Sequence, residues 1–170
     1  MISFTRSARL AIIGTLAVAG LAGCSAGGTA SSPTNAATNA AASAASGGGT
    51  VDVALSEFAV IPSVSSIEAG MVTFTATNSG PDDPHELVVI KTDLGDRRLP
   101  VNSEGKVDEA AAGLTVIGEI EEFEPGKTGT VTLDLAPGKY VLVCNIVQDE
   151  PDGTKESHYL KGMSTEFKVP

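Results

Sequence analysis

Residues 128–144 read TGTVTLDLAPGKYVLVC. Apolar side chains alternate with Thr and Asp over residues 130–135, which is the period-two pattern of a half-buried strand. The turn signal Ala-Pro-Gly-Lys follows at 136–139. Residues 140–143 then form a continuous apolar run, which is typical of a strand buried on both faces. This stretch therefore predicts two strands separated by a turn, and it ends on a cysteine.

Similar strand patterns recur on either side of this stretch. Apolar residues alternate with small or polar ones at 51–55 and 72–76, and 87–90 is a second continuous apolar run. Phe167 and Val169 predict a last strand that closes the domain. The pattern is weaker between residues 92 and 118, where a surface loop and a short helix over 107–112 fit the sequence.

Turn residues separate these runs, for example Ser79-Gly80-Pro81 and Pro125-Gly126. Six or seven strands within residues 51–170 predict an all-β fold, either an antiparallel β-sandwich or a Greek-key barrel. A single domain of this length can bury roughly two-thirds of its surface.

Composition excludes several classes of function. The 170 residues carry 11 Lys and Arg against 21 Asp and Glu, which gives a net charge of -10. This argues against a nucleic-acid partner, because binding phosphates requires clustered Lys and Arg. Two His and two Cys rule out a disulfide scaffold and a four-cysteine zinc site. The sequence has no Gly-rich phosphate loop and no nucleophile elbow, so we expect a protein that is not an enzyme.

The N-terminus has the pattern of an export signal. Two Arg residues precede an uncharged, mostly apolar run at 10–22, which is too short to span a membrane as a helix. The run ends in Leu21-Ala22-Gly23-Cys24, which resembles a bacterial lipobox. The resemblance implies that residues 1–23 are a signal peptide and that Cys24 is lipidated. An ordinary signal peptide with an incidental cysteine is the alternative.

Residues 24–50 are predicted to be a flexible linker. After Cys24 this stretch contains only Ala, Gly, Ser, Thr, Asn and one Pro, so it cannot bury enough apolar surface to offset the cost of ordering. We therefore expect a disordered tether that holds the domain 51–170 on a membrane through acyl chains. The expected location is the cell envelope, outside the cytoplasm.

Four residues of the predicted domain suit a soft metal. Cys144 ends one buried strand and has no disulfide partner once Cys24 is lipidated, while His85 opens the other buried strand. His158 and Met163 stand shortly before the last strand. Two imidazoles, one thiolate and a weak thioether are the ligand set of a blue copper site. Taken singly, each residue has a plain structural alternative as a satisfied histidine, a core thiol or a core-filling methionine.

These motifs resemble the cupredoxin family over most of residues 51–170. The resemblance rests on Thr77-Asn78-Ser79-Gly80 before His85, on Pro137-Gly138-Lys139-Tyr140 before Cys144, and on His158-x4-Met163 before a closing strand. It implies a cupredoxin-like Greek-key sandwich with one type 1 copper, bound by His85, Cys144, His158 and Met163. The family's usual role is single-electron transfer.

Two departures from the family are visible. Thirteen residues (145–157) separate Cys144 from His158, which is longer than in the small electron carriers, although copper nitrite reductases tolerate a longer loop. Glu86 stands after the first histidine, where many cupredoxins carry Asn or Asp as a brace, so that role is not transferred to it.

The sequence therefore predicts a monomeric, membrane-tethered carrier of single electrons between redox protein partners. Tyr159, Leu160 and an exposed edge of His158 are expected to form an apolar docking patch. Two other hypotheses stay open. The chain could deliver copper in metal homeostasis, or it could be a metal-free interaction domain of the same fold.

Overall fold

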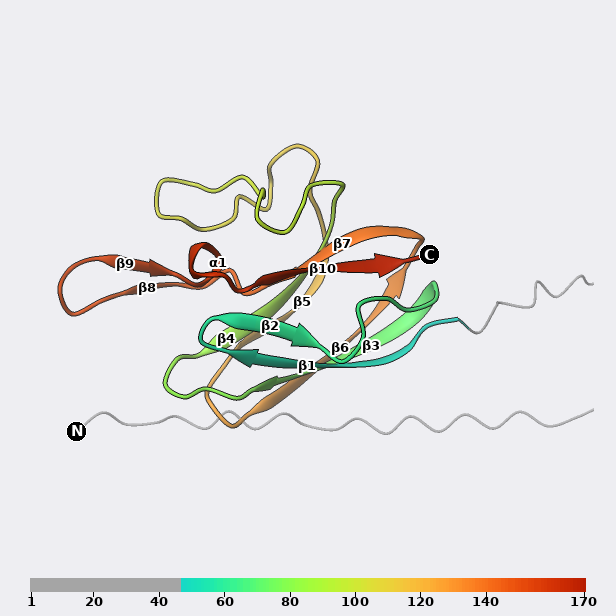
Figure 1. Ribbon diagram of the computed structural model, residues 1–170, viewed down its shortest axis with the longest axis horizontal. Coiled ribbons are helices and arrows are strands. Elements are labelled where there is room, and N and C mark those ends of the chain that lie inside the picture. The colour runs from blue at the N-terminus through green and yellow to red at the C-terminus, as the bar shows by residue number, and fades with distance from the viewer. Residues whose placement is uncertain (1–46) are drawn as a thin grey trace, which may run out of the picture. The chain divides into compact units, whose positions relative to one another are not determined.

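The computed structural model describes residues 47–170 of the chain (Figure 1). The predicted signal peptide, Cys24 and the linker up to residue 46 lie outside the described residues. Strand β1 begins at Gly49, within the last residues of the predicted linker. Within residues 47–170, no helix is long and apolar enough to cross a membrane.

Two four-stranded sheets form the domain. The first has the order β2 (Ala59–Pro62), β1 (Gly49–Ser56), β3 (Gly70–Asn78) and β6 (Thr128–Leu135). The second has the order β10 (Ser164–Val169), β7 (Gly138–Val143), β4 (His85–Lys91) and β5 (Thr115–Phe123). All neighbours pair antiparallel except β1 and β3, which are parallel.

A short hairpin and one helical turn complete the described chain. The hairpin consists of β8 (Val147–Asp149) and β9 (Lys155–Ser157), and α1 (His158–Lys161) follows it directly. Figure 1 shows this hairpin extending from the sandwich beside α1. The hairpin accounts for the long separation between Cys144 and His158 in the sequence.

The main core lies between the two sheets. Period-two burial in β1 and β3 directs Val53 and Phe74 to the same cluster as Leu87, Leu142 and the closing-strand residue Phe167. This arrangement follows from the alternation of side chains along a strand. The predicted all-β sandwich is therefore confirmed.

A second core covers the outer face of β4 and β7. Val88 and Val141 point to this side, where Leu99, Val107 and Tyr159 pack on them. Both central strands are thus buried on two faces, as their continuous apolar runs predict. The covering residues come partly from the segment between β4 and β5, which is why that segment is not a simple surface loop.

Two details differ from the sequence-based expectation. The short helix that fits residues 107–112 is absent from the structure, where Val107 instead forms a bridge with Val101 and turns follow. Strand β5 was not predicted, because its sequence has no clear period. It is an edge strand whose pairing with β4 contains irregularities. Among its residues only Ile120 is buried, so hydrophobic alternation cannot mark it.

Candidate metal centre

His85 is placed at the first position of β4 by an ordered loop. The buried side chain of Asn78 organises this loop, because its amide donates to the backbone oxygens of Asp83 and Phe123 at 2.8 and 3.0 Å. Its carbonyl oxygen accepts from the N–H of Gly80 at 2.8 Å. The motif that precedes His85 in the sequence therefore fixes where the strand begins.

Backbone hydrogen bonds tie Cys144, His158 and Met163 together. The N–H of Cys144 donates to the carbonyl of Met163 at 3.0 Å, and the N–H of Met163 donates to the carbonyl of His158 at 2.9 Å. Gly162 ends α1 with a φ of 127°, a conformation that favours glycine, and so turns the chain back toward the site. Met163 is fully buried in the same core cluster as Cys144.

Three ligand atoms from distant parts of the chain converge. The Sγ atom of Cys144 lies 3.4 Å from Nδ1 of His158 and 3.9 Å from Nδ1 of His85, and the two Nδ1 atoms are 3.2 Å apart. All three residues are completely buried. One cation could reach the three atoms together, because they all lie within 4.8 Å of one another.

Burial sets the charge state of this cluster. It lowers the pKa of His85 and of His158, and the second ring is lowered further by its proximity to the first. Burial also raises the pKa of Cys144 to about 12. The imidazoles are therefore neutral with lone pairs to offer, whereas the thiol needs a cation before it can ionise. Sulfur with neutral imidazole fits a soft transition metal such as copper.

Glu86 and Asn145 connect the cluster to the covering segment. Oε1 of Glu86 accepts the backbone N–H of Asn145 at 3.0 Å, so Glu86 braces the residue after Cys144. The Asn145 side chain accepts from the N–H of Val107 at 2.6 Å and donates to its carbonyl at 3.1 Å. It also donates to Glu109 at 2.7 Å. These bonds immobilise the chain that leaves Cys144.

The outer edge of His158 is covered, contrary to the sequence-based expectation. Its Nε2 lies 3.1 Å from Nε2 of Gln148 on β8, and Phe58 packs edge-on against its ring at a centroid distance of 5.4 Å. The prediction of an exposed histidine edge is therefore wrong. Sequence patterns give no sign of this cover, because Gln148 belongs to a polar stretch that resembles any surface loop.

Tyr159 also differs from its predicted role in docking. It is 4% exposed, lies in the second core and accepts the N–H of Leu99 on its hydroxyl at 2.9 Å. The one helical turn of α1 directs Tyr159 inward and leaves Leu160 63% exposed. Tyr159 is thus a packing residue, and only Leu160 keeps the exposure that a docking contact needs.

Two carboxylates lie close to His158. Asp83 and Glu156 each place an oxygen within 4.8 Å of a ring nitrogen of His158 and of each other. Oε2 of Glu156 is already paired with Nζ of Lys161 at 2.7 Å. The two carboxylates share His158 with the buried cluster and place negative charge beside it.

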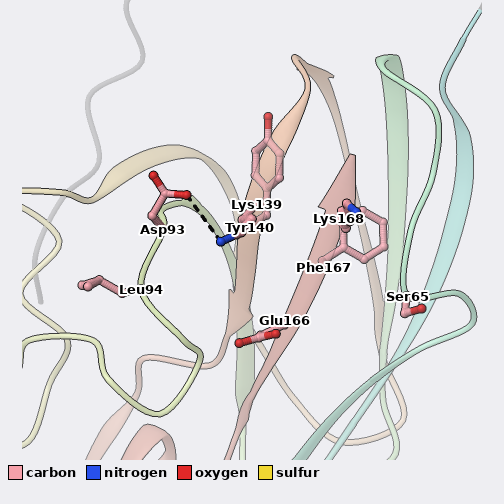
Figure 2. Close-up of a pocket in the computed structure, with 8 residues that line it drawn as sticks. All are labelled: Ser65, Asp93, Leu94, Lys139, Tyr140, Glu166, Phe167 and Lys168. Carbon is pink, nitrogen blue, oxygen red and sulfur yellow. Dashed lines mark ion pairs between the residues drawn. The ribbon is translucent and has the colours of Figure 1, made fainter. Parts of the chain in front are cut away.

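A pocket of about 330 Å³ lies at the other end of the β7–β10 pair (Figure 2). Its wall includes Lys139 and Lys168, which are partners near one end of that ladder, whereas Cys144 follows the opposite end. Figure 2 shows Lys139 facing Asp93, with an N–O separation of 3.8 Å. None of the described metal-ligand groupings includes a residue of this pocket, so the buried cluster is the candidate site.

No protein-family model and no curated protein matches the chain. Among solved structures, a dithionite-reduced auracyanin from the photosynthetic bacterium Roseiflexus castenholzii is 19% identical, with a TM-score of 0.46, over 72% of this chain and 96% of that chain. Auracyanin A, a blue copper protein from Chloroflexus aurantiacus, is also 19% identical, with a TM-score of 0.46, over 73% and 100%. Rusticyanin from Thiobacillus ferrooxidans is 20% identical, with a TM-score of 0.41, over 71% and 77%.

The side chains of this chain, and not those likenesses, point to a metal site. His85, Cys144 and His158 meet at one end of a two-sheet β-sandwich, and Met163 is hydrogen-bonded through its backbone to two of them. The described domain thus has the all-β fold and the buried cluster that its sequence resemblance to the cupredoxins implies.

Proposed function

We propose that this chain is a cupredoxin that carries single electrons through one type 1 copper. The observation that carries the proposal is the convergence of one thiol and two neutral imidazoles within 4.8 Å, in a site closed to solvent. His85, Cys144 and His158 would hold the metal, with Met163 as the weak fourth ligand. When bound, copper supplies a centre that gains and loses one electron.

The chain's own residues provide a stable setting for that change of oxidation state. The backbone bonds among Cys144, His158 and Met163, and the side-chain bonds of Asn145, restrict movement of the ligands. A rigid ligand set lowers the rearrangement that accompanies electron transfer. Burial of the cluster also excludes water from the metal position.

Redox partners would dock where Leu160 is exposed. This residue stands two positions after His158 on α1, so a partner that contacts it comes near a ligand. The surface that surrounds it belongs to an acidic protein, and this favours a partner with positive charge.

The proposed location is the outer face of a membrane, with Cys24 as the lipid attachment point. A Cys24→Ala variant tests this part directly. It should lose incorporation of a labelled fatty acid and move from the membrane fraction to the soluble fraction. Retention of label and membrane association in the variant would remove the lipid anchor from the account.

Copper delivery is the second candidate. It is supported by the cover over His158, because Gln148 and Phe58 keep a partner from touching the imidazole directly. Electron self-exchange and copper transfer to a chelating acceptor separate the two functions when both rates are measured on the copper-loaded protein. Fast self-exchange with retained copper supports the carrier, and slow self-exchange with rapid copper loss supports delivery. Failure to bind copper would favour a metal-free interaction domain.

A further inference from the structure

Two buried polar atoms at the edge of the cluster have no hydrogen-bond partner. Among residues 47–170 these are the only such side-chain nitrogen or oxygen atoms, namely Nε2 of His85 and Oε2 of Glu57. The two residues face each other, with Nε2 of His85 3.9 Å from Oε1 of Glu57. Unpaired buried polar groups cost stability, so a carboxylate and an imidazole that lie this close and each keep an unpaired atom are candidates for pairing with each other.

Glu57 is held in place for this contact. Its Oε1 accepts the backbone N–H groups of Asp82 and Asp83 at 3.0 and 2.7 Å. Its side chain is 12% exposed although it lies in the turn between β1 and β2. Both backbone N–H groups donate to Oε1, and Oε2 of the same carboxylate is left without a hydrogen-bond partner.

The donors and acceptors of the cluster define which nitrogen of His85 carries the proton. The amide nitrogen of Gln148 can only donate, so Nε2 of His158 accepts and its Nδ1 carries the hydrogen. That Nδ1–H faces Nδ1 of His85 at 3.2 Å, which must therefore accept. A neutral His85 then carries its hydrogen on Nε2, the atom that faces Glu57.

We propose that the Glu57 carboxylate accepts a hydrogen bond from Nε2–H of His85 and so keeps Nδ1 of His85 free and oriented to bind the metal. Glu57 acts as a positioning residue, because it reaches the metal only through His85. A carboxylate on the far nitrogen of a ligating histidine fixes the ring and makes it a stronger donor. The inference rests on the proposed function for the metal, while the protonation state of His85 can be tested without it.

The first test uses the metal-free protein. Nitrogen-15 NMR of the imidazoles has only two histidines to assign, and it should find His85 in the Nε2–H form. Exchange of that proton with solvent should be slow in the wild type and at least tenfold faster in Glu57→Ala and Glu57→Gln, because the single amide oxygen of Gln is taken by the N–H groups of Asp82 and Asp83. An Nδ1–H form of His85, or equal exchange in all three proteins, would overturn the proposal.

The second test uses the copper-loaded protein. Loss of a negative charge beside His85 disfavours Cu(II), so the reduction potential should rise in Glu57→Gln and in Glu57→Ala. Asp134→Asn removes the same charge at the end of β6 that pairs with the start of β3, away from Asn78 and the cluster. This control variant should shift the reduction potential far less. Equal potentials in wild type and both Glu57 variants would contradict the role of Glu57 toward the metal. A wild type that binds no copper would refute the proposed function instead, and the NMR result would still decide the contact.

Discussion

The protonation states of single residues at the site are set by burial more than by neighbouring charges. Cys144, His85 and His158 are fully buried, and each has its pKa displaced toward the neutral form. Neutral histidines bind a metal without a net loss of protons, because the hydrogen on Nδ1 of His158 can move to Nε2, whereas the thiol must lose its proton. Metal binding and protonation at Cys144 are therefore coupled.

Copper binding at pH 7 should release about one proton for each metal ion. The reason is that burial raises the pKa of Cys144 to about 12, so the metal-free thiol is protonated, while the two imidazoles carry no extra proton. The measurement is proton release in a weakly buffered copper titration. Cys144→Ser should lack this release, and an equal release from both proteins would contradict the assignment of Cys144.

Glu86 gives a pH dependence to the stability of the metal-free protein. Burial is the main cause that raises its pKa to about 7 from a value of 4.5, so the folded state binds an extra proton between these limits. Stability from this group is therefore lost as the pH rises through that window. Glu86→Gln should increase the free energy of unfolding by about 2 kcal/mol at pH 8, and by much less at pH 5.

Urea unfolding of wild type and variant at the two pH values checks this prediction. Glutamine keeps the acceptor for the N–H of Asn145, so the comparison isolates the charge. The same gain at both pH values would mean that the ionised carboxylate is not the source of the cost.

Some site residues could be predicted from sequence and others could not. His85, Cys144 and His158 stand at the ends of buried strands or before the last one, and few other soft ligands compete with them. Glu57 could not be found, because it lies in a turn and meets His85 only after β1 and β4 have folded into different sheets. Tyr159 was predicted on the wrong side because one helical turn has too little pattern to show which residues it buries.

At the scale of elements, the two sheets meet closely along β5 and β6. A Cβ atom built on Gly129 of β6 would collide with the side chain of Ile120 on β5, and one on Gly118 of β5 would collide with Leu133 of β6. The absence of side chains at these glycines allows the neighbouring strand to approach. Strand β5 therefore depends on a partner in the opposite sheet that its own sequence does not reveal.

Gly129→Ala should destabilise the domain by about 1–3 kcal/mol, the usual cost of overpacking. The β-branched side chain of Ile120 cannot turn away easily, so the strands must separate. Thermal or urea unfolding measures the loss. Gly126→Ala is not a suitable control because its φ of 75° adds strain. Ile120→Ala removes the colliding Cγ2 atom, so Gly129→Ala combined with Ile120→Ala should cost less than the sum of the two single losses, and strict additivity would refute the close contact.

Strands β4 and β7 could be predicted as elements, unlike β5. Their continuous apolar runs correspond to burial on both faces, one against the main core and one against the second core. Strand β2 and the β8–β9 hairpin are short and polar in part, so tertiary contacts and not local propensity determine them. The sequence thus predicted the centre of the sandwich better than its edges.

At the scale of the whole molecule, net charge and apolar exposure bear on the proposed docking surface. The net charge of -10 favours encounter with a basic surface, and Leu160 is an exposed apolar side chain close to the cluster. Met71 is exposed to a similar degree but stands at the Gly70 end of β3, next to Asp134 in the ladder with β6. Substitutions of Leu160 and of Met71 therefore distinguish docking near the cluster from a general effect of exposed apolar side chains.

Leu160→Asp should slow electron transfer to a basic redox partner by about tenfold, whereas Met71→Asp should leave the rate nearly unchanged. A change of about 1.4 kcal/mol in the docking free energy corresponds to that factor. Stopped-flow kinetics at several salt concentrations gives the rates, which should fall with added salt for the wild type. Equal slowing by both variants would move the docking surface away from α1.

In the proposed function, Cys144 binds copper together with the two histidines. Visible absorption of the domain during titration with Cu(II), in wild type and Cys144→Ser, tests it most directly. We predict an intense blue thiolate-to-copper band that saturates at one equivalent in the wild type and is absent from the folded variant. A wild type that binds no copper, or a band that persists without the thiol, would contradict the account.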